Sequence, residues 1–163
     1  TMKMKTLFLL PILLLSLISF SSQGADFQKG LDAYQSGDYA TALSEWRPLA
    51  EQGDTTAQFY LGWIYDNGKG VLQDYKTAVK WYKLAAEQGG TSAQTNLGVS
   101  YSIGQGVPQD FIYAHMWGNI SSSNGDENGG KLRDLAAEHM TPSQIEKAQR
   151  LARECVAKNY KGC

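Results

Sequence analysis

The sequence predicts an all-α protein, a short α/α solenoid of helix-turn-helix repeats with a helical C-terminal cap. Three observations predict this fold. The stretch LGWIYDNGKGVLQDY at 61–75 recurs 36 positions later as LGVSYSIGQGVPQDF, with eight of fifteen residues identical. The matching residues follow helical spacing and not strand alternation. A degenerate third copy lies upstream, and a fixed period of this length is typical of stacked structural repeats.

The first 24 residues are expected to be a cleaved signal peptide. Lys3 and Lys5 precede an apolar run at 7–20, and small and polar residues follow it. This layout is typical of secretory signals, and the run is shorter than the ~20 residues of a membrane-spanning helix. Cleavage is predicted after Gly24, with an uncleaved anchor as the alternative. The mature chain is therefore expected to be periplasmic or secreted, without insertion into a membrane.

The net charge argues against nucleic acid as a partner. The chain has 15 basic and 16 acidic residues, and loss of Lys3 and Lys5 with the signal changes the formal net charge from −1 to about −3. Binding to nucleic acid or to an anionic membrane usually relies on a basic surface. The 139 residues that remain suffice for one domain with a modest core.

The first repeat unit, residues 25–53, is degenerate. Tyr34 is paired with Tyr65 of the next unit, and AEQG at 50–53 recurs at 86–89. The turn between its two helices, at 35–38, is shorter than in the later units. Pro48 lies in the second helix and predicts a kink or a restart there.

The two full units, residues 54–89 and 90–125, each predict two helices joined by a glycine-rich turn. Gly68 and Gly104 are expected to end the first helices in the left-handed conformation, and Gly62 and Gly98 to let a neighbouring helix approach. The alternative, a phosphate-binding loop, would need a buried strand before the glycines. The positions predicted to be structural are Ala57, Leu61, Gly62, Tyr65, Gly68, Gly70, Ala78, Trp81, Ala93, Leu97, Gly98, Tyr101, Gly104, Gly106, Ala114 and Trp117.

Residues 126–163 are predicted to form the helical C-terminal cap. The segment KLRDLAAEHM at 131–140 predicts a short helix. Thr141, Pro142 and Gln144 then have the spacing of a capping box that begins a last, amphipathic helix. Terminal units of a solenoid need a polar outer face, which this tail supplies.

The two cysteines, Cys155 and Cys163, are expected to form a disulfide in an exported chain. Eight residues of straight helix would separate them by about 12 Å, whereas a disulfide needs Cα atoms within about 7 Å. The last helix is therefore predicted to end between them, near Asn159. Two free thiols are the alternative.

The sequence predicts no catalytic residue, metal site or cofactor. His115 and His139 are interpreted as packing or capping residues, because each lacks a nucleophile or a metal ligand nearby in the sequence. The paired Trp81 and Trp117 are interpreted as core residues and not as a sugar-binding platform.

The pattern A-Q-x-x-L-G-x-x-Y-x-x-G-x-G-V-x-Q-D-Y-x-x-A-x-x-W-Y-x-x-A-A-E-Q-G, spelled by residues 57–89, resembles the Sel-1-like repeat. This family is a longer-turned relative of the tetratricopeptide repeat, and the resemblance covers about residues 26–125. It implies a right-handed solenoid that acts as a scaffold or adaptor, often in bacterial periplasms. The tail from Tyr113 to Glu154 also resembles that of bacterial members.

The first helices are expected to line a concave groove that binds a peptide or helix of another protein. On each first helix, one side carries none of the repeat positions, and residues at i, i+4 and i+7 follow that side. These residues are Gln28, Asp32, Gln35, Phe59, Trp63, Asp66, Thr95, Val99 and Ser102. Phe59 and Trp63 predict an aromatic binding patch, and Asp32 and Asp66 are expected to select the polarity of the partner. The alternative is that both aromatic rings pack against the preceding unit.

Two other functions stay open from the sequence. Some disulfide-rich relatives bind or cleave β-lactams, but they have a cysteine pair in each repeat, whereas this chain has one pair outside the repeats. The second open function is a chaperone-like or inhibitor role within a cell-envelope assembly.

Overall fold

The computed structural model describes residues 25–163, and the predicted signal peptide lies outside them. Within these residues the chain forms eight α-helices and no strand. The helices are α1 (Phe27–Ser36), α2 (Tyr39–Glu51), α3 (Thr55–Asn67), α4 (Tyr75–Ala86), α5 (Thr91–Ile103), α6 (Phe111–Ser123), α7 (Glu127–Ala137) and α8 (Pro142–Ala157). Across the described part of the chain, none of these helices is long and apolar enough to cross a membrane. The predicted all-α class is confirmed.

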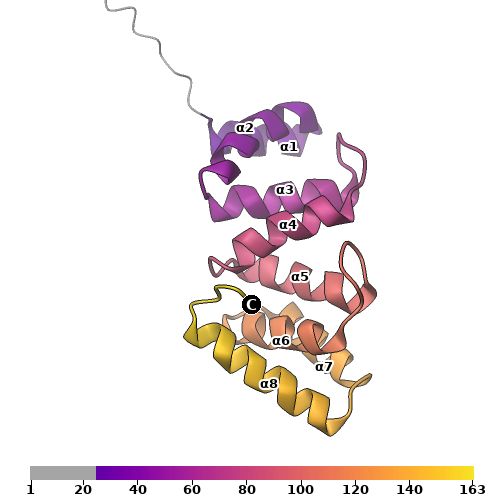
Figure 1. Ribbon diagram of the computed structural model, residues 1–163. Coiled ribbons are helices and arrows are strands. Elements are labelled where there is room, and N and C mark those ends of the chain that lie inside the picture. The colour runs from indigo at the N-terminus through magenta and orange to yellow at the C-terminus, as the bar shows by residue number, and fades with distance from the viewer. Residues whose placement is uncertain (1–24) are drawn as a thin grey trace, which may run out of the picture.

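The helices stack along one direction as helical hairpins (Figure 1). In each of the first three pairs the two helices pack on one another, and successive pairs contact each other through α2 with α3 and α4 with α5. The predicted solenoid is therefore confirmed. α2 runs as one helix through Pro48 and does not restart there.

Two apolar clusters form the core of the stack. The first surrounds Trp46 and joins α1, α2 and α3. The second surrounds Tyr82 and Trp117 and joins α4, α5 and α6 with α8. Trp46 and Tyr82 are 36 residues apart and both are fully buried, so the same place in each unit holds a large ring. Burial of a large apolar side chain contributes about 1.5–3 kcal/mol to folding.

Glycines allow the two helices of a unit to approach. A Cβ added to Gly62 would lie 2.5 Å from the ring of Tyr82, and one added to Gly30 would lie 2.5 Å from the ring of Trp46. Gly68 and Gly104 cap the ends of α3 and α5 with left-handed φ angles of 62° and 73°. A residue with a Cβ adopts such angles only at a free-energy cost.

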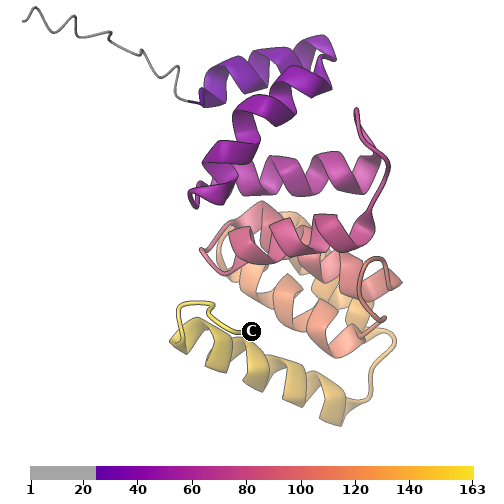
Figure 2. The ribbon, with the colours of Figure 1, turned by 45° about the horizontal axis from the view of Figure 1, so that its top comes forward.

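The C-terminal cap differs in part from its prediction. α7 begins at Glu127 and not at 131, because the glycines before Lys131 make a close contact with α6. A Cβ on Gly118 of α6 would lie 2.8 Å from the carbonyl oxygen of Gly129. α7 packs against both α5 and α6, whereas α8 packs on α6 and does not pair with α7 as a second helix would (Figure 2).

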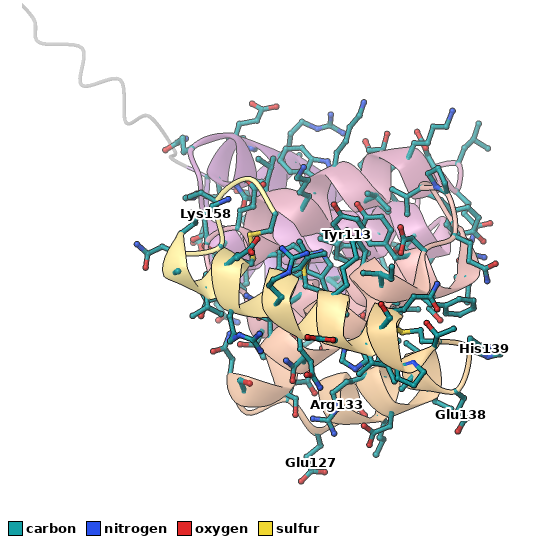
Figure 3. All side chains as sticks on the ribbon, turned by 60° about the horizontal axis from the view of Figure 1, so that its bottom comes forward. Tyr113, Glu127, Arg133, Glu138, His139 and Lys158 are labelled. Carbon is teal, nitrogen blue, oxygen red and sulfur yellow. A yellow bond between two sulfur atoms is a disulfide. The ribbon has the colours of Figure 1, made fainter. Side chains whose placement is uncertain are left out.

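The expected disulfide between Cys155 and Cys163 is confirmed, with Cα atoms 5.5 Å apart. α8 ends at Ala157, and the chain turns back through Asn159 and Tyr160, which both have positive φ angles. Figure 3 shows this loop beside Lys158, folded back over the end of α8.

Candidate functional site

Three exposed apolar side chains lie on α5 and α7, two helices that contact each other. Val99 and Ile103 are one helical turn apart on α5 and are 38% and 53% exposed, and Leu135 of α7 is 58% exposed. Leu135 follows Val99 by 36 residues, so the two occupy equivalent positions of helices that contact each other. Trp63 has the same position on α3, 36 residues before Val99. We call the side of α3, α5 and α7 that carries these four residues the first-helix face.

Phe59 lies at the edge of this face, beside a hollow. Its ring is half-buried and packs 5.5 Å from the ring of Tyr60 and 6.1 Å from that of Tyr82, measured between centroids. The hollow has a volume of about 150 Å³, and Phe59, Thr55 and Thr56 line it together with residues 90–93. Phe59 therefore packs toward its own unit and the next one, with part of its ring open to the hollow.

Trp63 packs against the preceding unit. Its ring meets that of Tyr34 edge-on at 5.4 Å, and it is half-buried against the first core cluster. Phe59 and Trp63 therefore do not form a freely exposed aromatic pair. The rest of its side chain is exposed to solvent.

Asp66 is a half-buried acid with one oxygen already engaged. The hydroxyl of Tyr82 donates a hydrogen bond of 3.2 Å to Oδ2 of Asp66. Burial raises the pKa of Asp66, and the Tyr82 hydrogen bond opposes this rise. Burial also raises the pKa of Tyr82, so its hydroxyl stays protonated as the donor. This pair fixes the end of α3 against α4.

Gln28 and Asp32 lie on α1 but outside the first-helix face. Both are exposed, and Nε2 of Gln28 donates to Oδ1 of Asp32 at 2.8 Å. The predicted alignment of α1 with α3 is wrong by one residue, because Gly30 packs on Trp46 as Gly62 packs on Tyr82. A shift of one residue rotates the side chain by about 100° around the helix axis. The residues of α1 that correspond to Phe59, Trp63 and Asp66 of α3 are therefore Phe27, Leu31 and Tyr34.

Thr95 cannot line an open groove. It is only 8% exposed, and its hydroxyl donates a hydrogen bond of 2.6 Å to Oδ2 of Asp126, the residue that caps the start of α7. α7 therefore covers the part of α5 where the sequence predicts a binding residue. The expectation for Thr95 is corrected, whereas Val99, one turn further along α5, stays exposed.

The two histidines lie in different surroundings. His115 is 3% exposed and its Nδ1 has no hydrogen-bond partner. His139 is exposed and stacks on Phe111 at a centroid distance of 4.5 Å, and Figure 3 shows it at the end of the turn after α7. In the described part of the chain, no group of three or more acidic, histidine or cysteine side chains could hold a metal ion.

Sequence reasoning missed Ile103 and Leu135 as members of the face. The signal that could have found Leu135 is the helix start at Asp126, which follows Gly90 and Asp54 at the repeat period of 36. Continuing the repeat register through α7 places Leu135 in line with Val99 and Trp63. The glycine-rich sequence before Lys131 concealed this continuation.

Comparison with known proteins supports the repeats and the fold. A family model described as Sel1 repeat matches residues 55–90 and 91–126, one residue later than the predicted units. A Sel1 repeat protein from Oxalobacter formigenes is 34% identical with a TM-score of 0.60, over 66% of this chain and 84% of that chain. No curated protein matches.

A second solved structure is that of a protective antigen present in uropathogenic Escherichia coli strains, which displays an SLR fold. It is 31% identical with a TM-score of 0.77, over 80% of this chain and 29% of that chain. The chain thus spans less than a third of the length of this antigen.

Proposed function

Because the chain belongs to the Sel1 repeat family, whose members generally act as scaffolds for protein–protein interaction, we propose that it holds a peptide or a helix of another protein against its first-helix face. The observation that carries this proposal is the alignment of Trp63, Val99 and Leu135 on three consecutive first helices, with Ile103 beside Val99. Exposed apolar side chains that lie together commonly mark sites of protein interaction.

The partner would gain affinity by covering these side chains. Six large apolar side chains are exposed within residues 25–163, and three of them lie on α5 and α7. Covering a half-exposed Val, Ile or Leu side chain contributes about 1 kcal/mol before the costs of association. The hollow beside Phe59 supplies a further place for one side chain of the partner.

The proposed place of action is the periplasm or the exterior of a bacterial cell. The disulfide between Cys155 and Cys163 supports this proposal, because structural disulfides persist mainly in oxidising compartments. The basic and apolar pattern of the first 24 residues, which lie outside the described residues, supports it from the sequence.

Affinity capture with a matched pair of variants tests the proposal. Ile103→Asp places a charge on the first-helix face, and Leu84→Asp places the same charge on α4, where Leu84 is 45% exposed. The purified chain and both variants would be immobilised and exposed to an extract of the envelope proteins of its own cells. We expect a protein retained by the native chain and by Leu84→Asp to be lost with Ile103→Asp. Equal retention by both variants would contradict the proposed site.

A further inference from the structure

Buried glutamines bridge the turns between successive units. Gln58 of α3 is almost fully buried, and its Nε2 donates a hydrogen bond of 3.0 Å to the carbonyl oxygen of Ala50, near the end of α2. Its Oε1 accepts a hydrogen bond of 2.7 Å from Nε2 of Gln88, in the turn after α4. One side chain therefore ties the turn between α2 and α3 to the turn between α4 and α5.

The same bridge recurs 36 residues later. Gln94 of α5 is fully buried and donates from Nε2 to the carbonyl oxygen of Ala86 at 3.2 Å. Its Oε1 accepts from Nδ2 of Asn124, the residue after α6, at 3.0 Å. A buried amide without hydrogen-bond partners is unfavourable, so these bonds favour one spacing between consecutive turns.

The C-terminal loop supplies the last member of the second bridge. The hydroxyl of Tyr160 lies within hydrogen-bond distance of both amide atoms of Asn124, at 3.2 Å from Nδ2 and 3.3 Å from Oδ1. The edge of its ring lies against Gly89, 3.4 Å from where a Cβ on that glycine would be. Tyr160 therefore touches the turn before α5 and the turn before α7 at once.

The disulfide holds Tyr160 in this position. Asn159 and Tyr160 have φ angles of 50° and 66°, and this left-handed conformation is unfavourable for a bulky side chain such as that of Tyr160. Cys155 is buried in the second core cluster, and the bond to Cys163 returns the chain over Tyr160 to that cluster. Tyr160 also packs against this cluster, and its backbone N–H donates to the carbonyl oxygen of Cys155 at 2.9 Å, so the bond adds to contacts that the loop itself makes.

We propose that the Cys155–Cys163 disulfide is a redox-sensitive clamp that locks Tyr160 across two successive turns of the stack. A dithiol reductant would open the clamp by exchange. Its thiolate attacks the partly exposed Sγ of Cys163, which breaks the bond to Cys155 and releases Cys155 as a thiolate. Its second thiol then attacks the mixed disulfide and releases Cys163. The protein gains two thiols and their two protons, and the reductant becomes a disulfide. Tyr160 then leaves both turns, while the helices stay folded on their own cores.

Hydrogen exchange of backbone amides tests the clamp in the purified chain. The amides of Gly90 and Asp126 report on the two turns, because they donate to the carbonyl oxygens of Ala85 and Ser121. With dithiothreitol as the probe, we expect exchange in segments 86–90 and 122–126 to become at least tenfold faster. Exchange within the middle of α3 should change less than twofold, which separates release of the clamp from loss of global stability.

Two variants complete the experiment. Tyr160→Ala keeps the disulfide but removes the ring, so it should give the fast exchange of both turns without reductant, and reductant should then add little. Lys161→Ala, an exposed neighbour in the same loop, should behave as the native chain. Unchanged exchange in the two turns on reduction, or equal acceleration across all helices, would overturn the proposal. These readouts need no partner, so they stand or fall apart from the proposed function.

Discussion

His115 is a buried ionisable side chain at a position where the preceding unit has Val79. Burial lowers the pKa of His115, and the nearby guanidinium of Arg133 lowers it further, whereas Asp134 opposes the shift. In the folded state the imidazole therefore stays neutral at pH values where the unfolded chain already binds a proton. Its burial is compatible with folding only while it is uncharged.

The first prediction concerns the dependence of stability on pH. Because the folded pKa of His115 is below the ordinary value of 6.5, its contribution to stability is complete above that pH and is lost as the pH falls below it. The difference in unfolding free energy between the native chain and His115→Val should change by at most about 1.4 kcal/mol per pH unit. Urea unfolding at pH 7.5 and 5.0 measures it, with His139→Val as the exposed control. The same pH response in all three proteins would refute the role of His115.

The second prediction concerns the close contact at Gly62. A methyl group there would overlap the ring of Tyr82, so Gly62→Ala should lower the free energy of unfolding by about 1–3 kcal/mol despite the better helix propensity of alanine. Gly130→Ala is the matched control, because its Cβ would meet only the side chain of Ser122, with the hydroxyl oxygen 3.2 Å away. Thermal unfolding should rank Gly62→Ala clearly below Gly130→Ala, and the reverse order would disprove the contact.

At the scale of one element, α8 is held mainly by its apolar stripe on α6 and by its own first turn. Thr141 Oγ1 accepts from the backbone N–H of Gln144 at 3.3 Å, and Oε1 of Gln144 accepts from the backbone N–H of Thr141 at 2.8 Å. The buried residues of the stripe are Ala148, Ala152 and Cys155. Two of these three side chains are small and bury little apolar area, so the capping box makes a comparatively large contribution to the stability of α8.

The third prediction follows from this capping box. Thr141→Ala removes the acceptor for the amide of Gln144 and should lower the free energy of unfolding by about 1 kcal/mol. Ser143→Ala, in the same turn and exposed, should change it by less than half as much. Chemical denaturation of both variants measures the difference, and equal effects would show that the cap does not stabilise α8.

Local chemistry explains how much of the fold could be predicted from the sequence. The ends of α3 and α5 follow from Gly68 and Gly104, and the start of α8 from Thr141, because each depends on a few neighbouring residues. The start of α7 could not be predicted in this way. Its first turn is rich in glycine, and its helical state depends on the contact of Gly129 with α6.

The candidate site was harder to predict than the fold for the same reason. The alignment of α1 depends on which glycine meets Trp46, and a shift of one residue moved Gln28 and Asp32 off the face. The burial of Thr95 depends on Asp126, which lies at the repeat period but in a glycine-rich stretch that does not by itself predict a helix. Val99 remained on the face because α7 leaves that turn of α5 uncovered.

At the scale of the whole molecule, the tail connects parts of the stack that are distant in the sequence. α8 packs on α6, Tyr160 reaches Gly89, and the disulfide closes the loop between them. Because each unit of a solenoid otherwise touches only its neighbours, the tail supplies contacts that the units alone would not make. The stability of the stack should therefore depend on the oxidised tail.

The fourth prediction is that reduction of the Cys155–Cys163 bond lowers the free energy of unfolding of the second core cluster, which contains Cys155, by about 2–3 kcal/mol, while the first cluster, which contains α3, keeps its stability. This magnitude is the one expected from the loop-closure entropy of so short a loop. Urea unfolding with and without a reductant measures this. A chain with both cysteines changed to serine controls for other effects of the reductant, since its unfolding should not respond. A native chain that is equally stable in both conditions would contradict this role of the tail.

The central claim is that a partner protein binds the first-helix face, and site-specific photo-crosslinking in living cells tests it most directly. A photoreactive amino acid would replace Ile103 on this face or Leu84 on α4, two exposed apolar positions on different helices. We predict a discrete crosslinked protein from position 103 and none from position 84. A crosslink from position 84 alone, or none from either position, would contradict the claim.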